Sequence, residues 1–492
     1  MRKLLFLLLL FVLGLKKTSY KKNKNTLIIL IDGLSHSSLQ YGMSHKSCPT
    51  ISKLLKNDYV LNQYFCGLPA ATTATEALLF YGTNHNIPGF TWYDRSLHSF
   101  IRGNRSKELS TFEDNYQKKR GLFKDGSVIM SVYSGGATQL VMSGRNLRFP
   151  KTSIVFKLMQ YIALGILYPV QFLRTITLTL KTIILYRTNN QEESRKILET
   201  IFLGQFSCFL TEVEIYRGTS RIFVDFLLYD EYAHKYGPTH PSAINSLKLI
   251  DRYVQRILKS IKTSEFSYEV IILSDHGQSK SIPYDGIDDK SSRDIAISFQ
   301  LDHSKVIKTY GTTISTDSCE YIYSVPGGST LQLYFSHSLT KAYLEDELEK
   351  KYPRCIQNLL EKPAFGWILI RNSNQSTRLY NKKGFITFTL NQSPTISGSP
   401  FEGIAPHTSQ QLIKSFKTYA HFPNNGDIVI FGNTTPTNEV YSFEKHRGTH
   451  GGFFGNMCYP FCITNNNIIK AELNNPSMTM ESLFNKIEYN MK

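Results

Sequence analysis

Three stretches of the chain consist almost entirely of apolar, β-branched or aromatic residues, without alternation between polar and apolar positions. They are Thr26–Gly33 (TLIILIDG), Ile222–His234 (IFVDFLLYDEYAH) and Glu269–Gly277 (EVIILSDHG). A run of this kind is typical of a strand that is buried on both faces of a parallel sheet. We therefore expect three buried strands that each end in an aspartate, namely Asp32, Asp230 and Asp275.

Apolar residues at helical spacing lie between these runs. From Pro241 to Ile261 they recur every three or four positions, and a proline suits the first turn of a helix. A second amphipathic pattern begins near Thr50. Alternating strands and helices predict an α/β fold. In such folds ligands bind beyond the carboxyl ends of the strands, so we expect the three aspartates to converge there.

Two regions interrupt this alternation. Residues of about 300–445 contain short strand-like pieces separated by Gly, Asn and Pro, and residues of about 100–220 form a basic, partly apolar insertion. Within that insertion Lys151–Arg187 has no acidic residue, and its uncharged run Leu158–Leu173 is too short to span a bilayer comfortably. This segment either lies on an anionic membrane surface or forms a helical hairpin packed on the rest of the fold.

The N-terminus contains an uncharged apolar run, Leu4–Leu15, with basic residues on both sides. A spanning helix needs about 18–20 residues, so the run fits the core of a signal peptide better. We expect residues 1–25 to be a signal peptide or an N-terminal membrane anchor, with a buried helix as the alternative. Residues 26–492 then form one exported domain that works outside the cytoplasm, periplasmic, secreted or membrane-anchored.

Composition narrows the class of partner. Lys and Arg number 56 against 39 Asp and Glu, a formal net charge of +17 over 492 residues, which favours anionic partners. Because no zinc-finger spacing, RNA-binding signature or phosphate-binding loop motif occurs, we expect no nucleic acid partner. The seven cysteines are scattered, and an exported chain of this kind has room for disulfides whose pairing cannot be deduced from the sequence.

Ligand-type side chains follow the predicted strands. Asp275 and His276 are adjacent, Asp230 and His234 are four residues apart, and His450 stands beside two glycines. Together with Asp32 and a threonine, these carboxylates and imidazoles suit two divalent transition metal ions, with Zn²⁺ expected. Two ions about 4 Å apart stabilise both the attacking and the leaving oxygen of a phosphoryl displacement.

The stretch Ala70–Gly82 (AATTATEALLFYG) places three threonines at the start of a predicted helix. Threonine is a good N-cap, so capping is the plain interpretation. The alternative is that one hydroxyl is a nucleophile, with the helix N-terminus ready to bind a phosphate.

Four motifs occur in one order along the chain: IDG, YDEYAHKYGP, SDHG and THGG. With this order the chain resembles the alkaline phosphatase superfamily, and within it the type I phosphodiesterase/nucleotide pyrophosphatase family. The resemblance covers Thr26 to about Gly89, Ile222–Gly277 and Gly448 to about Ile463. It implies an alkaline-phosphatase-like α/β core, in which helices flank a mostly parallel central sheet and insertions interrupt it.

The resemblance also implies a role for each residue of the motifs. Asp32, Thr72, Asp275 and His276 would hold one ion. The second ion would be held by Asp230, His234 and His450. In the family the nucleophilic threonine precedes the glycine of a turn by ten residues, which here points from Gly82 back to Thr72, with Thr73 as the next candidate.

One part of the family pattern is missing. Nucleotide-cleaving members carry an asparagine that helps to hold the phosphate, whereas the corresponding stretch here, Ile87–Asp94, is shorter and has none. Backbone N–H groups at Thr72 and Thr73 can bind an oxyanion instead. We expect substrate to contact Thr73 and three aromatic residues, Phe90, Trp92 and Tyr93. For Trp92 the alternative is packing in the core.

The resulting hypothesis is an exported two-metal phosphoesterase that acts on a phosphodiester or lipid phosphate through Thr72 and a covalent phospho-enzyme intermediate. A phosphomonoesterase or a phospho-headgroup transferase of the same fold is the nearest alternative. A sulfatase is disfavoured because TTATE lacks the modifiable Cys or Ser in its motif. From another class, a non-catalytic surface protein could keep the fold and bind metal or anions.

Overall fold

The structure is a computed structural model. It describes residues 25–116, 121–139, 141–143, 146–148, 191–285, 289–311 and 319–491, together with single positions between 169 and 180. The predicted signal peptide or anchor, apart from Asn25, and most of the basic segment Lys151–Arg187 lie outside the described residues. Among the helices that are described, none is both long and apolar enough to cross a membrane.

The larger part of the molecule is built on an eight-stranded sheet, in the order β2-β21-β9-β1-β8-β5-β6-β7. Its five middle strands, from β9 to β6, are parallel to one another, and the outer strands pair antiparallel. This confirms the predicted mostly parallel central sheet. The strands are β1 (Asn25–Ile31), β2 (Val60–Gln63), β5 (Ser127–Ser131), β6 (Val141–Ser143), β7 (Asn146–Arg148), β8 (Arg221–Phe226), β9 (Tyr268–Leu273) and β21 (Phe461–Thr464).

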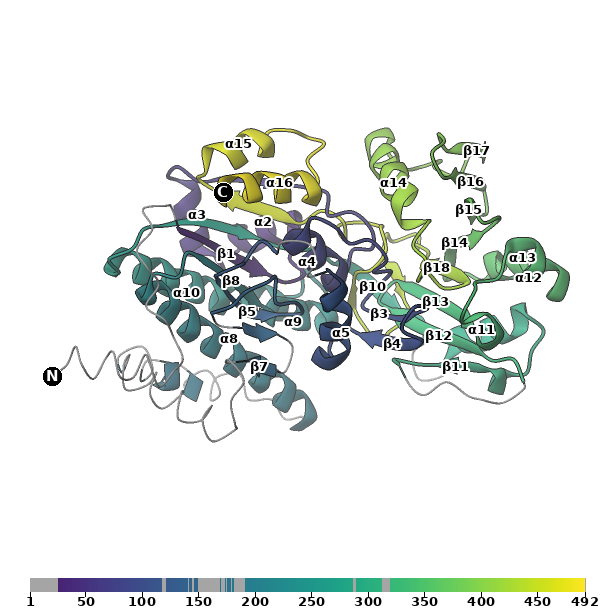
Figure 1. Cartoon of the computed structure of the whole chain (residues 1–492), viewed down its shortest axis with the longest axis horizontal. Coiled ribbons are helices and arrows are strands. Elements are labelled where there is room, and N and C mark those ends of the chain that lie inside the picture. Colours follow the sequence, from purple (N-terminus) through teal and green to yellow (C-terminus); the bar gives the residue numbers. More distant parts are fainter. Residues whose placement is uncertain are drawn as a thin grey trace.

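Helices cover both faces of this sheet (Figure 1). They are α2 (His36–Ser44), α3 (Pro49–Leu55), α4 (Thr72–Tyr81), α5 (Ser106–Tyr116), α8 (Gln191–Arg217), α9 (Leu228–Tyr236), α10 (Pro241–Thr263), α15 (Asn467–Leu473) and α16 (Met480–Met491). Leu27, Ile29 and Ile31 of β1 pack in the core that contains α8 and α10. Ile28 and Leu30 point the other way, into the core with α4 and α16. A strand buried on both faces has no polar alternation, which explains its continuous apolar sequence.

The smaller part of the molecule is a second eight-stranded sheet, mostly antiparallel, that lies beside the first (Figure 1). Its strands are β11 (Val306–Lys308), β12 (Ile322–Gly327), β13 (Thr330–Phe335), β14 (Phe365–Arg371), β15 (Ser376–Asn381), β16 (Gly384–Thr389), β17 (Thr395–Gly398) and β18 (Ile428–Gly432). Its helices are α11 (Lys290–Ser298), α12 (Glu345–Lys351), α13 (Cys355–Glu361) and α14 (Pro406–Tyr419). The strand-like pieces expected between about 300 and 445 therefore form one sheet.

Short strands join the two parts. A hairpin pairs β3 (Thr91–Asp94) with β4 (Ser99–Arg102). A three-stranded sheet is made of β10 (Ser279–Pro283), β19 (Val440–Ser442) and β20 (Gly448–Thr449). The core on the α4 side also includes residues of the second sheet and of α14, such as Trp367, Phe431 and Phe416. One apolar core thus runs from the central sheet into the second.

One expected strand is shorter than predicted. The run Ile222–His234 was expected to be a strand ending at Asp230, but β8 ends at Phe226 and α9 begins at Leu228. The buried residues of α9, which include Tyr229, Tyr232 and Ala233, recur at helical spacing. Because the aromatic residues continue the apolar run of β8, the sequence does not show clearly where the strand ends and the helix begins. Asp230 therefore lies in the first turn of a helix.

The first insertion packs partly on the core. Its helix α8 lies against α10, where Arg256 and Glu212 form an ion pair with 2.6 Å between Nη2 and Oε2. Both side chains are buried. Arg256 also donates to Thr175, one of the described positions of the basic segment, over 3.1 Å. That position thus faces α10.

Candidate active site

The site lies at the carboxyl ends of the three adjacent parallel strands β9, β1 and β8. Asp32 follows β1 directly, and Asp275 and His276 follow β9 after a single serine. Asp230 and His234 are four residues apart on α9, which begins two residues after β8 ends, so both lie on one face of that helix. The remaining two residues, Thr72 at the first position of α4 and His450 directly after β20, come from elsewhere in the chain.

All seven side chains meet. Nε2 of His234 lies 3.1 Å from Oδ2 of Asp230 and 3.2 Å from Nε2 of His450. Nε2 of His276 lies 3.2 Å from Oδ2 of Asp275, 3.6 Å from Oδ1 of Asp32 and 3.2 Å from Oγ1 of Thr72. The rings of His276 and His450 stack with their centroids 4.0 Å apart, which joins the two groups.

A backbone carbonyl orients each of the three histidines. Nδ1 of His234 lies 2.8 Å from the carbonyl oxygen of Gly448, Nδ1 of His450 lies 2.9 Å from that of Ala70, and Nδ1 of His276 lies 3.1 Å from that of Gly277. A neutral ring that donates from Nδ1 has its lone pair on Nε2. Each Nε2 atom is therefore directed into the cluster, as metal-binding histidines usually are.

The chemistry of these atoms fits bound cations. Nε2 of His234 lies beside both Nε2 of His450 and a carboxylate oxygen of Asp230, so a cation bound there would be within reach of the lone pairs of all three groups. Oδ1 of Asp32 is buried and has no hydrogen-bond partner among the described residues. Two groups of three ligand atoms lie within 4.8 Å of one another, one of Asp32, Asp275 and His276, the other of Asp230, His276 and His450. A mixture of nitrogen and oxygen ligands suits divalent transition metals.

Burial and mutual charge shift the pKa values of the cluster. Burial lowers the pKa of His276 to about 4, and burial with the neighbouring histidines lowers that of His450 to about 3. Burial also opposes a charge on His234, but the carboxylate of Asp230 outweighs it and raises the pKa of His234 to about 9. Burial and the nearby carboxylates raise the pKa of Asp32 well above its usual value. Two imidazoles are thus neutral at pH 7, the form that binds metal.

The three threonines of α4 have different partners. The N-cap residue Ala71 offers no side-chain cap, so none of the three hydroxyls caps the helix. Thr73 donates to the carbonyl of Gly89 at 2.8 Å, and Thr75 donates to the carbonyl of Ala71 at 3.0 Å. Thr72 contacts His276 in the cluster, and Thr75 also donates to Oδ2 of Asp275 at 3.4 Å.

The aromatic residues that were expected to contact substrate lie mainly in the core. Trp92 is fully buried, and its ring packs edge-on against Phe112. Tyr93 is also buried, between Phe100 and Tyr334. Core packing, the alternative interpretation of Trp92, fits these contacts. Phe90 is half-buried, and its contact with substrate stays a prediction.

Two further side chains support the cluster, and the sequence analysis assigned no role to either of them. The amide of Gln278 donates to the carboxylate and to the carbonyl oxygen of Asp230. The ring of His446 lies 4.1 Å from that of His234, centroid to centroid. The sequence feature that could have identified Gln278 as a supporting residue is its position two residues after His276.

Comparison with known proteins places the chain in a family. Residues 26–294, more than half of the chain, match the family described as type I phosphodiesterase/nucleotide pyrophosphatase. The comparison with curated proteins finds no match.

Three solved structures are similar over nearly the whole chain. The alkaline phosphatase PafA is 11% identical with a TM-score of 0.57, covering 94% of this chain and 95% of that one. Phosphonoacetate hydrolase from Sinorhizobium meliloti 1021 is 12% identical with a TM-score of 0.50, covering 95% of each chain. Murine ectonucleotide pyrophosphatase/phosphodiesterase 5 is 12% identical with a TM-score of 0.48, also covering 95% of each chain. The first two show the alkaline phosphatase fold. The chain therefore belongs to the type I phosphodiesterase/nucleotide pyrophosphatase family and is a phosphoester hydrolase with this fold.

Proposed function

We propose that this protein is an exported, two-metal phosphodiesterase in which Thr72 is the nucleophile. The observation that carries the proposal is the position of the Thr72 hydroxyl, 3.2 Å from Nε2 of His276, at the edge of a buried cluster of ligand-type atoms. The hydroxyl of Thr73 donates to a backbone carbonyl instead, and that of Thr75 donates to the carbonyl of Ala71 and, at 3.4 Å, to Oδ2 of Asp275.

Two divalent cations, which we propose to be Zn²⁺, would occupy the cluster. Asp32, Thr72, Asp275 and His276 would hold one of them. Asp230, His234 and His450 would hold the other. When bound, such ions lower the pKa of a coordinated hydroxyl and stabilise negative charge on phosphate oxygens.

Residues of the chain would supply the nucleophile and orient the phosphate. Oγ1 of Thr72 loses its proton and bonds to phosphorus, while the bond from phosphorus to one ester oxygen breaks and that oxygen takes up a proton. The phosphate stays bound to Thr72, with the second ester group of the diester still attached. Because Ala71 provides no side-chain cap, the first backbone N–H groups of α4 are available to the phosphate oxygens. Water then cleaves the bond between Thr72 and phosphorus and restores the hydroxyl.

The substrate class follows from the family and the charge of the chain. A phosphodiester or a lipid phosphate fits a type I phosphodiesterase whose formal net charge is +17. The stretch Ile87–Asp94 lacks the asparagine of the nucleotide-cleaving members. We therefore propose a diester without a nucleotide, with phosphomonoesters as the alternative substrate.

Export is proposed from the N-terminal sequence. The run Leu4–Leu15 is apolar throughout, and two basic residues stand on either side of it. Such a pattern is read as a signal peptide or short anchor. The cluster would then work on the far side of a membrane.

Membrane contact is proposed from the exposed residues of the basic segment. Leu173, Ile176 and Leu180 are 62%, 42% and 57% exposed, although they are spaced for one helical face. Thr175 and Thr179 between them are buried. A helix that turns Thr175 and Thr179 inward and larger apolar side chains outward suits the boundary of an anionic membrane.

The position of Asp230 depends on a glycine. Gly33 has a φ of +68°, and a Cβ added there would overlap Oδ1 of Asp230. Its N–H also donates to Oδ1 of Asp275 at 3.2 Å. Gly33 thus allows two carboxylates to approach the backbone.

We expect Thr72→Ala to lower kcat at least about 10³-fold, because the nucleophile is lost. Metal content should stay near that of the unmodified protein, since only one ligand of several is removed. Thr73→Ala, the matched control, should retain most activity. Turnover of bis(p-nitrophenyl) phosphate and of p-nitrophenyl phosphate, with and without added zinc, measures this and compares diester with monoester. An active Thr72→Ala beside an inactive Thr73→Ala would move the nucleophile to Thr73.

We expect Gly33→Ala to lower kcat/KM at least about 10-fold and to reduce bound metal, because the new methyl group displaces Asp230. Gly403→Ala is the control, since Gly403 has a φ of +88° and open space around its Cβ position. Both variants carry the same type of backbone strain, so thermal unfolding should shift similarly. Equal activity in the two variants would contradict the role given to Gly33.

We expect replacement of Leu8 and Leu9 by Arg to retain the chain in the cytoplasm, because charges interrupt the apolar run. Cell fractionation followed by immunoblotting measures the distribution of the protein. Replacement of Lys21 and Lys22 by Arg is the control and should leave it unchanged. An unmodified chain found in the cytoplasm would show that the run is not an export signal.

We expect the chain from Asn25 onward to co-sediment with anionic vesicles, and to bind less as salt increases. Replacing Leu173 and Leu180 by Ser, or Arg174 and Lys181 by Glu, should reduce the bound fraction several-fold. Ile297→Ser, at an exposed position of α11, is the control and should bind normally. Indifference to vesicles would favour the packed helical hairpin and a soluble substrate.

A further inference from the structure

Two segments distant in sequence run side by side beneath the cluster. The first leads from Cys66 to Thr72, and the second from His450 to Cys458. At one end the N–H of Cys66 donates to the carbonyl of Cys458 at 3.0 Å. At the other end the N–H of Gly451, at 2.8 Å, and Nδ1 of His450, at 2.9 Å, both contact the carbonyl of Ala70.

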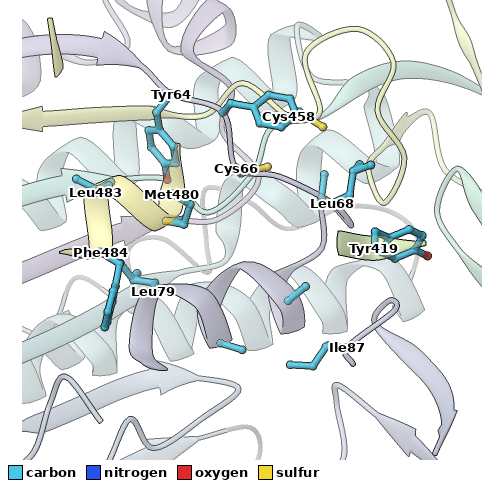
Figure 2. Close-up of a cluster of buried hydrophobic side chains, with 14 of the residues drawn as sticks. Tyr64, Cys66, Leu68, Leu79, Ile87, Tyr419, Cys458, Met480, Leu483 and Phe484 are labelled. Carbon is cyan, nitrogen blue, oxygen red and sulfur yellow. The ribbon is translucent and has the colours of Figure 1, made fainter. Parts of the chain in front are cut away.

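The thiols of these segments are neighbours. Cys66 and Cys458 are buried, and their Sγ atoms lie 3.6 and 3.7 Å from the same carbonyl oxygen, that of Gly67. Figure 2 shows the two sulfur atoms between the same loops, above α4. Burial raises the pKa of the Cys66 thiol well above its usual value, and the adjacent Cys458 thiol adds to the rise.

The backbone geometry suits a covalent link. The N–H of Cys66 donates to the carbonyl of Cys458, so the two residues lie side by side, as a disulfide with Cα atoms about 4.4–6.8 Å apart requires. No disulfide joins any of the seven cysteines in the structure. The thiols of two others, Cys208 and Cys355, donate to Tyr253 and Glu349.

We propose that Cys66 and Cys458 form a disulfide in the exported protein. The S–H bonds of both cysteines break and one S–S bond forms. The two electrons and two protons pass to a disulfide oxidant, such as glutathione disulfide, which is reduced to two thiols. The proposal rests on export for its oxidising environment, but the pairing itself depends only on the fold.

Burial determines when the bond forms. A protonated, inaccessible thiol reacts slowly with an oxidant. The bond therefore forms while the chain folds, when the two segments have met but the thiols still reach solvent. Once formed, it is protected from reductants.

The bond would link the segment that carries the nucleophile to the segment that carries a ligand. Thr72 is six residues after Cys66, and His450 is eight residues before Cys458. The link would stabilise the fold by constraining the unfolded chain. It would also keep Thr72 and His450 together when the protein is warmed.

The test refolds the reduced, denatured full chain in a glutathione/glutathione disulfide buffer, and in parallel in excess dithiothreitol. Free thiols are alkylated, the chain is digested without reduction, and linked peptides are identified by mass spectrometry. We expect one peptide pair joining Cys66 to Cys458. The oxidised chain should unfold about 5 °C above the reduced chain. Cys355→Ser, the matched control, should keep the link, and the double variant Cys66→Ser/Cys458→Ser should lose both the link and the shift.

Alkylated Cys66 and Cys458 in the oxidised, refolded chain would overturn the proposal, as would either one linked to a different cysteine. The peptide readout does not require folding of the serine variants. It is also independent of turnover, so an inactive protein with the link would count against the proposed catalysis and not against the disulfide.

Discussion

Burial of several carboxylates in one place is the constraint on which the rest of this structure depends. Asp32, Asp230 and Asp275 lie together at the ends of adjacent elements. Asp32 and Asp275 are at most 4% exposed. Buried carboxylates cost free energy unless positive charge or hydrogen bonds compensate them. The surrounding imidazoles, the amide of Gln278 and the backbone N–H of Gly33 provide part of that compensation. Bound cations would provide the remainder.

The parallel sheet is what creates this concentration of charge. In β9, β1 and β8 all carboxyl ends meet at one edge, and the register of β1 with both neighbours is continuous. An antiparallel arrangement would have sent every second end to the opposite edge. The apolar residues on both faces of β1 fix this edge in place, because each face packs on its own layer of helices.

Backbone carbonyls from remote segments complete the site. Gly448 and Ala70 orient His234 and His450, and each carbonyl belongs to a loop that carries another member of the cluster. The same loops bring Cys66 beside Cys458, as Figure 2 shows. The orientation of the histidines, the position of Thr72 and the proximity of the thiols thus share one set of contacts between two segments.

The sequence by itself determined the α/β class and the buried strands, because unbroken apolar runs that end in an aspartate form a local pattern. It also identified six of the seven clustered residues, all except Thr72, because these six lie in short motifs. It could not separate Thr72 from Thr73 without the family, since both stand at the start of one helix. Packing gives them different contacts: one hydroxyl lies next to His276 and the other donates to Gly89. The end of β8, the burial of Trp92, the support from Gln278 and the proximity of Cys66 to Cys458 were likewise decided only by tertiary structure. These features depend on contacts between residues that are far apart in the chain, and such contacts leave no local pattern in the sequence.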